Sequence, residues 1–120
     1  MLNLAVLSKK IMKASANSKE SWRAPANNAI DDNPNTIWHS QWTAPNQYAY
    51  NLTLNLEKTQ IITQVACLPR QDWTENGIIL NYNIYTSTDG SNYQKVTSGT
   101  WKNNRGKKNV QHSNLFLRNR

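Results

Sequence analysis

The chain has little of three features that small domains often depend on: paired cysteines, glycine-rich loops and long apolar runs. Its single cysteine, Cys67, cannot form a disulfide within the chain, and its place in an apolar run favours a buried, inert thiol. The four glycines form no phosphate-binding loop. No apolar run reaches the roughly 18 residues of a membrane helix, and Lys9 and Lys10 follow the first apolar stretch, whereas a signal peptide would place them before it. We therefore expect neither a membrane span nor a signal peptide.

Catalytic motifs are also missing from the sequence. It contains no Ser/His/Asp signature, no nucleophile elbow and no His/Cys metal spacing. Asp72 and Glu75 could be considered a carboxylate pair for glycoside cleavage, but both lie on one short loop, whereas such a pair flanks the scissile bond from two sides. We expect that the chain is not an enzyme.

Acidic residues are absent after residue 100, and this explains most of the formal net charge of +7. Residues 1–100 hold eight Lys/Arg against seven Asp/Glu, whereas residues 101–120 hold six Lys/Arg and no acid. A solvated basic terminus accounts for this pattern better than a surface built to bind phosphate. We therefore expect no nucleic-acid partner.

Alternating apolar and polar residues predict strands in a single all-β domain. Tyr50 to Leu56 and Leu80 to Tyr85 alternate with a period of two, and Ile61 to Leu68 is a continuous apolar run typical of an interior strand. A turn-forming stretch, Ser87 to Asn92, follows the third of these segments. Weaker strand patterns occupy residues 3–7, 13–16, 93–96, 99–102 and 108–111. Helix is confined to a turn or so near residues 24–31, so the pattern favours a β-sandwich or jelly roll.

An oxygen-rich turn lies between Asn28 and Thr36. Asp31, Asp32, Asn33 and Thr36 offer carboxylate, amide and hydroxyl oxygens, which are the ligands that Ca²⁺ prefers. The spacing is not that of an EF-hand, and no bidentate glutamate follows. Turns in which Asx side chains close on their own backbone explain the same residues equally well, so the chemistry alone leaves both interpretations open.

Two tryptophans and a histidine follow this turn. Trp38 is best placed to enter the core, whereas Trp42, in a polar loop, could present a flat apolar face to the C–H side of a sugar ring or simply pack against the protein. His39 has one donor and one acceptor nitrogen for a ligand hydroxyl, although a structural histidine is the simpler interpretation.

A second polar loop leaves the interior strand at Arg70. The Arg70 guanidinium can fork onto two neighbouring hydroxyls, and Asn76 can both donate and accept. The alternative is structural: Arg70 pairs with Asp72 or Glu75, and Asn76-Gly77 is a turn.

Several short motifs occur together in this chain: Ala29–Asp31, Asn33, Asn35–Ser40, Leu68–Gln71, Asn76–Gly77 and Ser87–Gly90. Together they resemble the coagulation-factor type C (discoidin) superfamily, and within it carbohydrate-binding module family 32. The similarity covers roughly residues 3–108 in order. The resemblance implies a jelly-roll β-sandwich, like that of galactose-binding domains, whose loops at one end bind ligand.

The resemblance also implies a structural Ca²⁺ beside the ligand site. Its ligands would be Asn28, through the carbonyl group, with Asp31, Asn33 and Thr36. The chain departs from the family at Asp32, which replaces a usual glycine and which an aspartate can tolerate in a left-handed turn at some cost. It departs again after residue 100, where the family supplies its remaining ligands and this chain has no acidic residue.

Galactose-type binders of the family place a histidine, an aromatic residue, an arginine and an asparagine around the sugar. Here His39, Trp42, Arg70 and Asn76 occupy these places. The implied mechanism is stacking of Trp42 on the apolar face of the sugar, with the other three side chains reading hydroxyl groups, including an axial one.

The resemblance fails beyond residue 108. The family continues through a last strand or two and another aromatic loop residue, whereas residues 109–120 form an atypical basic tail that looks truncated or altered. We therefore expect a domain over residues 1–108 that lacks its last strand. Such a sandwich would expose an edge, which predicts marginal stability or self-association along that edge.

The sequence thus predicts a non-catalytic module that binds a glycan ending in galactose or N-acetylgalactosamine. The resemblance implies a parent glycoside hydrolase in cis, secreted by a bacterium or held on its surface, and hence an extracellular location. The alternative is a discoidin-like domain that binds protein or an anionic membrane. Such domains use exposed apolar residues on their loops, whereas the corresponding loops here are polar.

Overall fold

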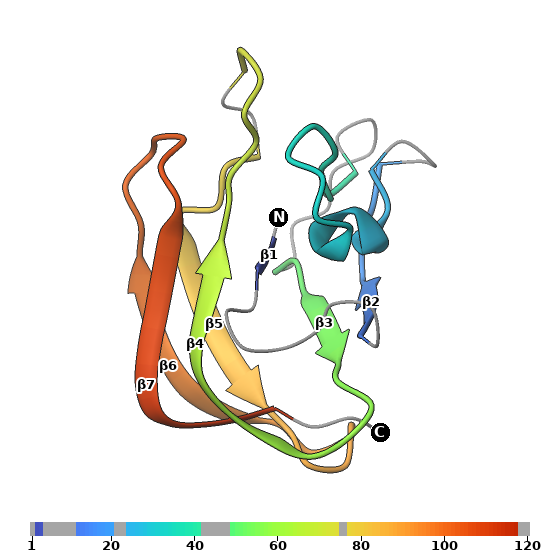
Figure 1. Cartoon of the computed structure of the whole chain (residues 1–120), viewed down its shortest axis with the longest axis vertical. Helices are drawn as coiled ribbons and strands as arrows, with labels where there is room; N and C mark the ends of the chain where they lie inside the picture. Colours follow the sequence, from blue (N-terminus) through green and yellow to red (C-terminus); the bar gives the residue numbers. More distant parts are fainter. Residues whose placement is uncertain (1, 4–11, 21–23, 42–48, 75–76, 118–120) are drawn as a thin grey trace.

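The described part of the chain is almost entirely β-structure. The computed structural model describes residues 2–3, 12–20, 24–41, 49–74 and 77–117 (Figure 1). In order, the elements are β1 (Leu2–Asn3), β2 (Lys13–Ala16), the 3-10 helix η3 (Ala26–Ile30), β3 (Leu52–Asn55), β4 (Gln60–Cys67), β5 (Asn81–Thr86), β6 (Gln94–Thr100) and β7 (Lys108–Leu117). The sandwich predicted from the alternating pattern is confirmed.

The strands pair antiparallel in three sheets. The first has the order β1-β4-β7, and β2-β3 and β5-β6 form the other two. Side chains from all three sheets meet in one core. Leu56 and Ile62 are fully buried at its centre, together with Met12 and Val65, and residues of β3, β5 and β6 pack around them. Burial of this apolar surface is the main force that holds the sheets together.

The strongest strand patterns match the structure closely. The segment predicted from Ile61 to Leu68 is β4, shifted by one residue, and Leu80 to Tyr85 is β5, also shifted by one. The weak pattern at residues 13–16 has the bounds of β2, whereas those at 93–96 and 99–102 belong to one strand, β6. The residues between them, Thr97 and Ser98, pair with β5 although they break the alternation, because backbone hydrogen bonds need no particular side chain.

The C-terminal segment continues the sheet where we expected a separate tail. Lys108 to Leu117 form β7, which pairs with β4 from Lys108 opposite Cys67 to Leu117 opposite Gln60. Val110 is buried in this strand. The alternation ends soon after Gln111, so the sequence pattern did not reveal the rest of the strand. Among the described strands β7 pairs only with β4, and self-association along its outer edge stays a prediction.

The loops that matter for function lie at one end of the sandwich. Figure 1 shows η3 and the loops that follow β4 and β6 together at this end, whereas the turn between β5 and β6 is at the other. The loop after β6 is anchored by Trp101, which stacks on Tyr82 with ring centroids 4.3 Å apart and whose backbone N–H donates to the Leu80 carbonyl (2.8 Å). Gly99 allows this arrangement, because a Cβ there would lie 2.5 Å from the Tyr82 hydroxyl.

In the described part of the chain, no helix is long and apolar enough to cross a membrane.

Candidate functional site

Six of the eight predicted site residues fall within the described segments, and two do not. Trp42 and Asn76 lie outside the described residues, so their predicted roles stay predictions. The other six lie at the loop end of the sandwich, on two segments. One segment, from η3 onward, carries Asn28, Asp31, Asn33, Thr36 and His39, and the loop after β4 carries Arg70.

The oxygen-rich turn folds around the carboxylate of Asp31. Its Oδ1 accepts the Asn33 backbone N–H (2.9 Å), and its Oδ2 accepts the Thr36 hydroxyl (2.5 Å). The Thr36 hydroxyl also lies 3.1 Å from the Asn33 carbonyl oxygen. These are the Asx-type turns that we considered as the structural alternative, and they bring a carboxylate and a carbonyl oxygen within hydrogen-bond distance of the same hydroxyl.

The flanking residues keep this turn in place. Asp32 has φ of 60°, so it adopts the left-handed conformation that the family resemblance led us to expect at this position. The Asn28 side-chain N–H donates to the Ile37 carbonyl (3.0 Å) and ties the middle of η3 to the segment that leads to His39. No group of three or more His, Cys, Asp or Glu side chains that could hold a metal exists in the described part of the chain. A cation here would therefore rely on one carboxylate and several neutral oxygens, a donor set that Ca²⁺ accepts and softer metals do not prefer.

His39 is held from both sides by backbone hydrogen bonds. Its N–H donates to the Ala24 carbonyl (3.4 Å), and its carbonyl accepts from the Glu20 N–H (2.9 Å). The side chain is only 7% exposed, and Nδ1 lies 2.7 Å from the Ser40 carbonyl oxygen. A carbonyl can only accept, so in the neutral ring Nδ1 carries the proton and Nε2 is the acceptor.

The loop after β4 closes over the histidine. Gly77 has φ of 84°, and a Cβ at this position would lie 2.7 Å from Cδ2 of His39 and closer still to Nε2. Only a glycine permits this approach, since any other residue would meet the ring and strain the backbone. The segment that carries His39 and the loop after β4 are therefore in contact. Gly77 in this loop lies against Nε2 of His39.

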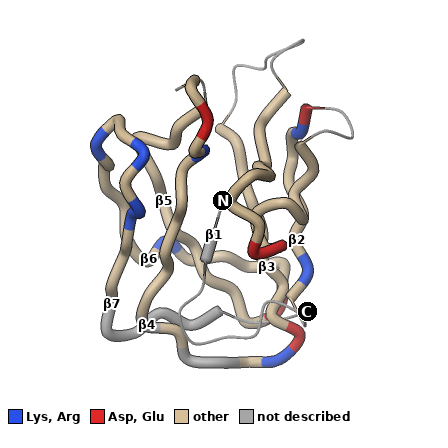
Figure 2. The backbone as a smooth tube through the Cα atoms, turned by 45° about the horizontal axis from the view of Figure 1, so that its top comes forward, with Lys and Arg blue, Asp and Glu red and all other residues tan. Residues whose placement is uncertain are grey.

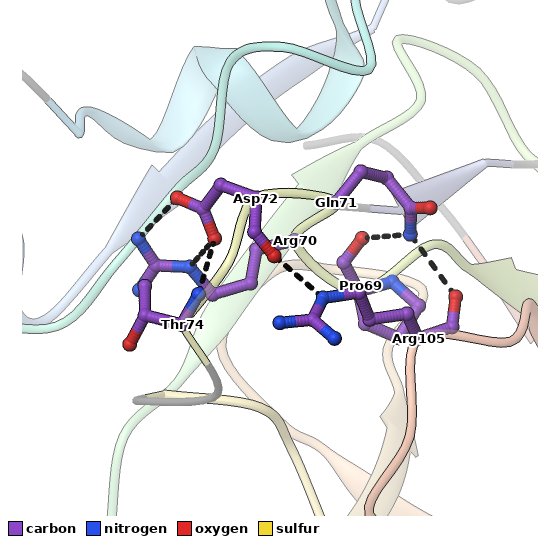
Figure 3. A network of polar contacts seen from close by, with 6 residues as sticks. All are labelled: Pro69, Arg70, Gln71, Asp72, Thr74 and Arg105. Atoms are coloured by element: carbon purple, nitrogen blue, oxygen red, sulfur yellow. Dashed lines mark hydrogen bonds and ion pairs between the residues drawn. The ribbon is translucent and has the colours of Figure 1, made fainter.

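Arg70 forms the ion pair that we had considered as its structural alternative. Its Nε and Nη2 each lie 2.8 Å from a different oxygen of Asp72, so the pair is bidentate (Figure 3). The side chain of Arg70 is 15% exposed. The hydrogen bond from Arg70 holds the pKa of the Asp72 carboxyl below its usual range. Because the fork fixes the guanidinium plane, Asp72 positions Arg70.

One tryptophan differs from its predicted position, and another had no predicted role. Trp38 is only partly buried and lies outside the central core cluster, with its indole N–H donating to the Ser18 carbonyl (2.9 Å). Trp73, which the sequence analysis did not single out, is 90% exposed in the loop after β4. Exposure depends on the path of the loop, so no local pattern identified it. The loops of this end are therefore not uniformly polar.

The basic residues also lie differently from the predicted solvated terminus. Figure 2 shows Lys and Arg gathered along the loop between β6 and β7. Arg105 donates from Nε to the Asp72 carbonyl (2.6 Å), and the Gln71 amide donates to the Arg105 carbonyl (3.0 Å). Lys108 is buried and its ammonium donates to Asn104. This loop is thus joined to the loop that carries Arg70.

Comparison with known proteins identifies the domain type. The sequence model of the F5/8 type C domain matches residues 11–118. The chain is 37% identical over 78 residues to a galactose oxidase of Gibberella zeae and, over the same length, 37% identical to a sialidase of Micromonospora viridifaciens. Each match covers 62% of this chain but only 12% of the relative, so the chain spans about an eighth of those proteins.

Solved structures with the same fold include two from Clostridium perfringens. One is a family 32 carbohydrate-binding module in complex with GalNAc-β-1,3-galactose, with a TM-score of 0.88 and 30% identity, covering 92% of this chain and 81% of that one. The other is the family 32 module of NanJ in complex with galactose, with a TM-score of 0.84 and 31% identity, covering 98% of this chain and 82% of that one.

Proposed function

The chain belongs to the F5/8 type C domain family, and from that membership we propose that it binds carbohydrate at the end of the sandwich where His39 and Arg70 lie. The solved structures that it resembles are carbohydrate-binding modules, so the domain is non-catalytic. The proposed ligand is a glycan that ends in galactose or N-acetylgalactosamine. Two of the similar modules are described with such sugars, which supports this choice.

One observation carries the proposal: the contact between His39 and the loop from Arg70 to Gly77. It places the His39 ring, which is 7% exposed, and an oriented guanidinium on neighbouring segments at the loop end of the sandwich. A sugar hydroxyl can donate to Nε2 of His39 and accept from an arginine N–H, a combination that suits a polyhydroxylated ring. Trp42 is proposed as the stacking face and Asn76 as a further hydroxyl partner.

We also propose that the turn from Asp31 to Thr36 holds Ca²⁺. The carboxylate of Asp31, the carbonyl group of Asn33 and the hydroxyl of Thr36 would bind it, with the carbonyl group of Asn28 completing the protein's share. The ion would supply positive charge that keeps the turn closed. It would stabilise the segment that ends at His39 and would take no part in chemistry.

The biological setting is part of the same proposal. A module of this kind would work in cis with a glycan-degrading enzyme outside the cell, as an extracellular or surface-attached protein. The similarity to modules of glycoside hydrolases and to a sialidase supports this setting.

Calorimetric titration with galactose, N-acetylgalactosamine and glucose tests the proposed function. We expect modest affinity for galactose and N-acetylgalactosamine. Glucose should bind more weakly, because its C4 hydroxyl is equatorial, whereas the C4 hydroxyl of the other two sugars is axial. Arg70→Lys keeps the charge but loses the fork and should weaken binding, as should His39→Ala. Lys95→Ala, on the exposed side of β6, is the control and should bind as the wild type does. The proposal fails if the wild type binds none of these sugars, or if all variants bind equally well.

A further inference from the structure

Trp73 is a large apolar side chain that the fold leaves in solvent. It is 90% exposed, whereas no other large hydrophobic residue in the described segments is more than 50% exposed. It lies in the loop after β4, which reaches beyond the end of the sandwich in Figure 1. Covering an exposed indole with an apolar surface lowers the free energy, so the position of Trp73 favours contact with a ligand.

The loop holds both neighbours of Trp73 in place. On one side, the Asp72 carboxylate is fixed by Arg70, and its backbone carbonyl accepts from Nε of Arg105 (2.6 Å). On the other side, the Thr74 backbone N–H donates to the Asp72 carboxylate (3.4 Å). Figure 3 shows these contacts meeting at Asp72, the residue before Trp73 in the chain. Little conformational entropy is then left to lose in this backbone when a ligand covers the indole.

Arg105 places hydrogen-bond donors close to this tryptophan. Its Nε is bound to the carbonyl of the peptide unit that joins Asp72 to Trp73. Because the guanidinium is planar, its two terminal nitrogens point away from that carbonyl, and in Figure 3 they contact none of the other residues drawn. The stacked Trp101 and the Gln71 amide, which donates to the Arg105 carbonyl (3.0 Å), keep the loop that carries Arg105 in position.

We propose that Trp73 and Arg105 form a second carbohydrate subsite that takes the sugar next to the terminal one. An exposed indole on a backbone whose preceding carbonyl binds an arginine can offer an aromatic face and hydrogen-bond donors to a pyranose ring, which has an apolar C–H face and hydroxyl groups at its rim. The subsite adjoins the first one, because Asp72 binds both Arg70 and Arg105, and the loop continues to Gly77 against His39. The inference rests on the proposed function and specifies the length of glycan that the domain recognises.

A membrane surface is the competing partner for an exposed tryptophan. The Asp72 carboxylate beside Trp73 is paired with Arg70, and Lys and Arg gather on the adjoining loop between β6 and β7, so charge does not decide between the two partners. The polarity of the loop favours the glycan, because membrane binding by loops relies on several apolar residues, whereas the neighbouring Thr74 and Asp72 are polar.

The test compares one sugar with two. Galactose and N-acetylgalactosamine are titrated calorimetrically beside GalNAc-β-1,3-galactose and a set of disaccharides that end in galactose through α or β 1,3-, 1,4- and 1,6-linkages. We expect at least one disaccharide to bind the wild type about two- to tenfold more tightly than its terminal monosaccharide, the range of an aromatic contact. Trp73→Ala should lose this gain and keep the monosaccharide affinity within about twofold. Arg105→Ala should lose part of it.

Controls separate the subsite from general effects. Trp73→Phe should restore much of the gain, and Tyr93→Ala, which removes an exposed aromatic residue near the opposite end, should change nothing. Tryptophan fluorescence should shift further to shorter wavelength with the disaccharide than with the monosaccharide, which would cover Trp42 alone, and the additional shift should vanish in Trp73→Ala. Sedimentation with vesicles of phosphatidylserine and phosphatidylcholine should show no binding that depends on Trp73.

Each contrary result has a definite meaning. Tighter disaccharide binding that survives in Trp73→Ala overturns the subsite, as does equal affinity for every disaccharide and its terminal sugar. Vesicle binding lost in Trp73→Ala overturns it in favour of a membrane contact. If no monosaccharide and no disaccharide binds the wild type, the proposed function itself fails.

Discussion

Replacing Gly77 by alanine should weaken galactose binding while leaving the domain folded. A Cβ at this position would lie 2.7 Å from Cδ2 of His39, whereas carbon atoms in ordinary contact are about 3.5–4.0 Å apart, so the loop or the ring must move by about 1 Å. The φ of 84° adds a cost of about 1–2 kcal/mol for a residue with a side chain. His39 is held by backbone hydrogen bonds on both sides, and we expect the loop to give way.

The two consequences of this substitution can be measured separately. Loss of one neutral hydrogen bond between His39 and the sugar removes about 0.5–1.5 kcal/mol, which lowers the affinity about two- to tenfold in calorimetric titration with galactose. The backbone strain should lower the melting temperature by about 4–8 °C for a domain of this size.

Gly106→Ala is the matched control for this experiment. Its Cβ would lie 3.2 Å from Oδ1 of Asn104, a contact that a small side-chain shift relieves, and Gly106 has no positive φ. We expect nearly wild-type affinity for galactose in this variant. Wild-type affinity in Gly77→Ala with a lowered melting temperature would show that the contact with His39 is structural only. Wild-type values for both quantities would refute the contact itself.

Three further substitutions test the core, the turns and the cation. Ile62→Ala removes a fully buried side chain and should lower the free energy of unfolding in urea by about 2–5 kcal/mol; a loss below about 1 kcal/mol would contradict its central place. Backbone N–H groups of Asn92 and Ser91 lower the pKa of Asp89, so the charge stabilises the fold above the unfolded pKa of about 3.9. Asp89→Asn should therefore melt earlier than the wild type at pH 7, with a difference that shrinks as the pH falls below 4; a constant difference would argue against the charge. Ca²⁺ should raise the melting temperature of the wild type after chelator treatment, and Thr36→Val should reduce this rise. An equal rise in both would place the ion elsewhere.

The strands could be predicted from the sequence because their signal is local. A period of two over residues 80–85 and a continuous apolar run over residues 61–68 each placed a strand within one residue. The C-terminal strand β7 was foreseen only as far as Gln111, because its later residues show no alternation while its backbone still pairs with β4.

The chemistry of the side chains identified the candidate site residues, but it did not predict which contacts they make. The sequence indicated that Arg70 could bind a hydroxyl or pair with a carboxylate, and the structure shows the pair with Asp72. It indicated both a cation site and Asx turns for the segment around Asp31, and the structure shows the turns. In each case the local sequence indicated which kinds of partner a side chain could bind, but it did not determine which one it binds.

The sequence by itself determined an all-β fold, a loop rich in oxygen donors and a set of motifs typical of one domain family. These properties depend on residue type and on spacing over a few residues, both of which are local to one segment of the sequence. The tertiary structure alone decided that Gly77 lies against His39, that Arg105 is bound to the loop of Arg70, and that Trp73 remains in water. Contacts between distant segments follow from how the sheets pair and where the loops leave them, and sequence spacing does not specify these.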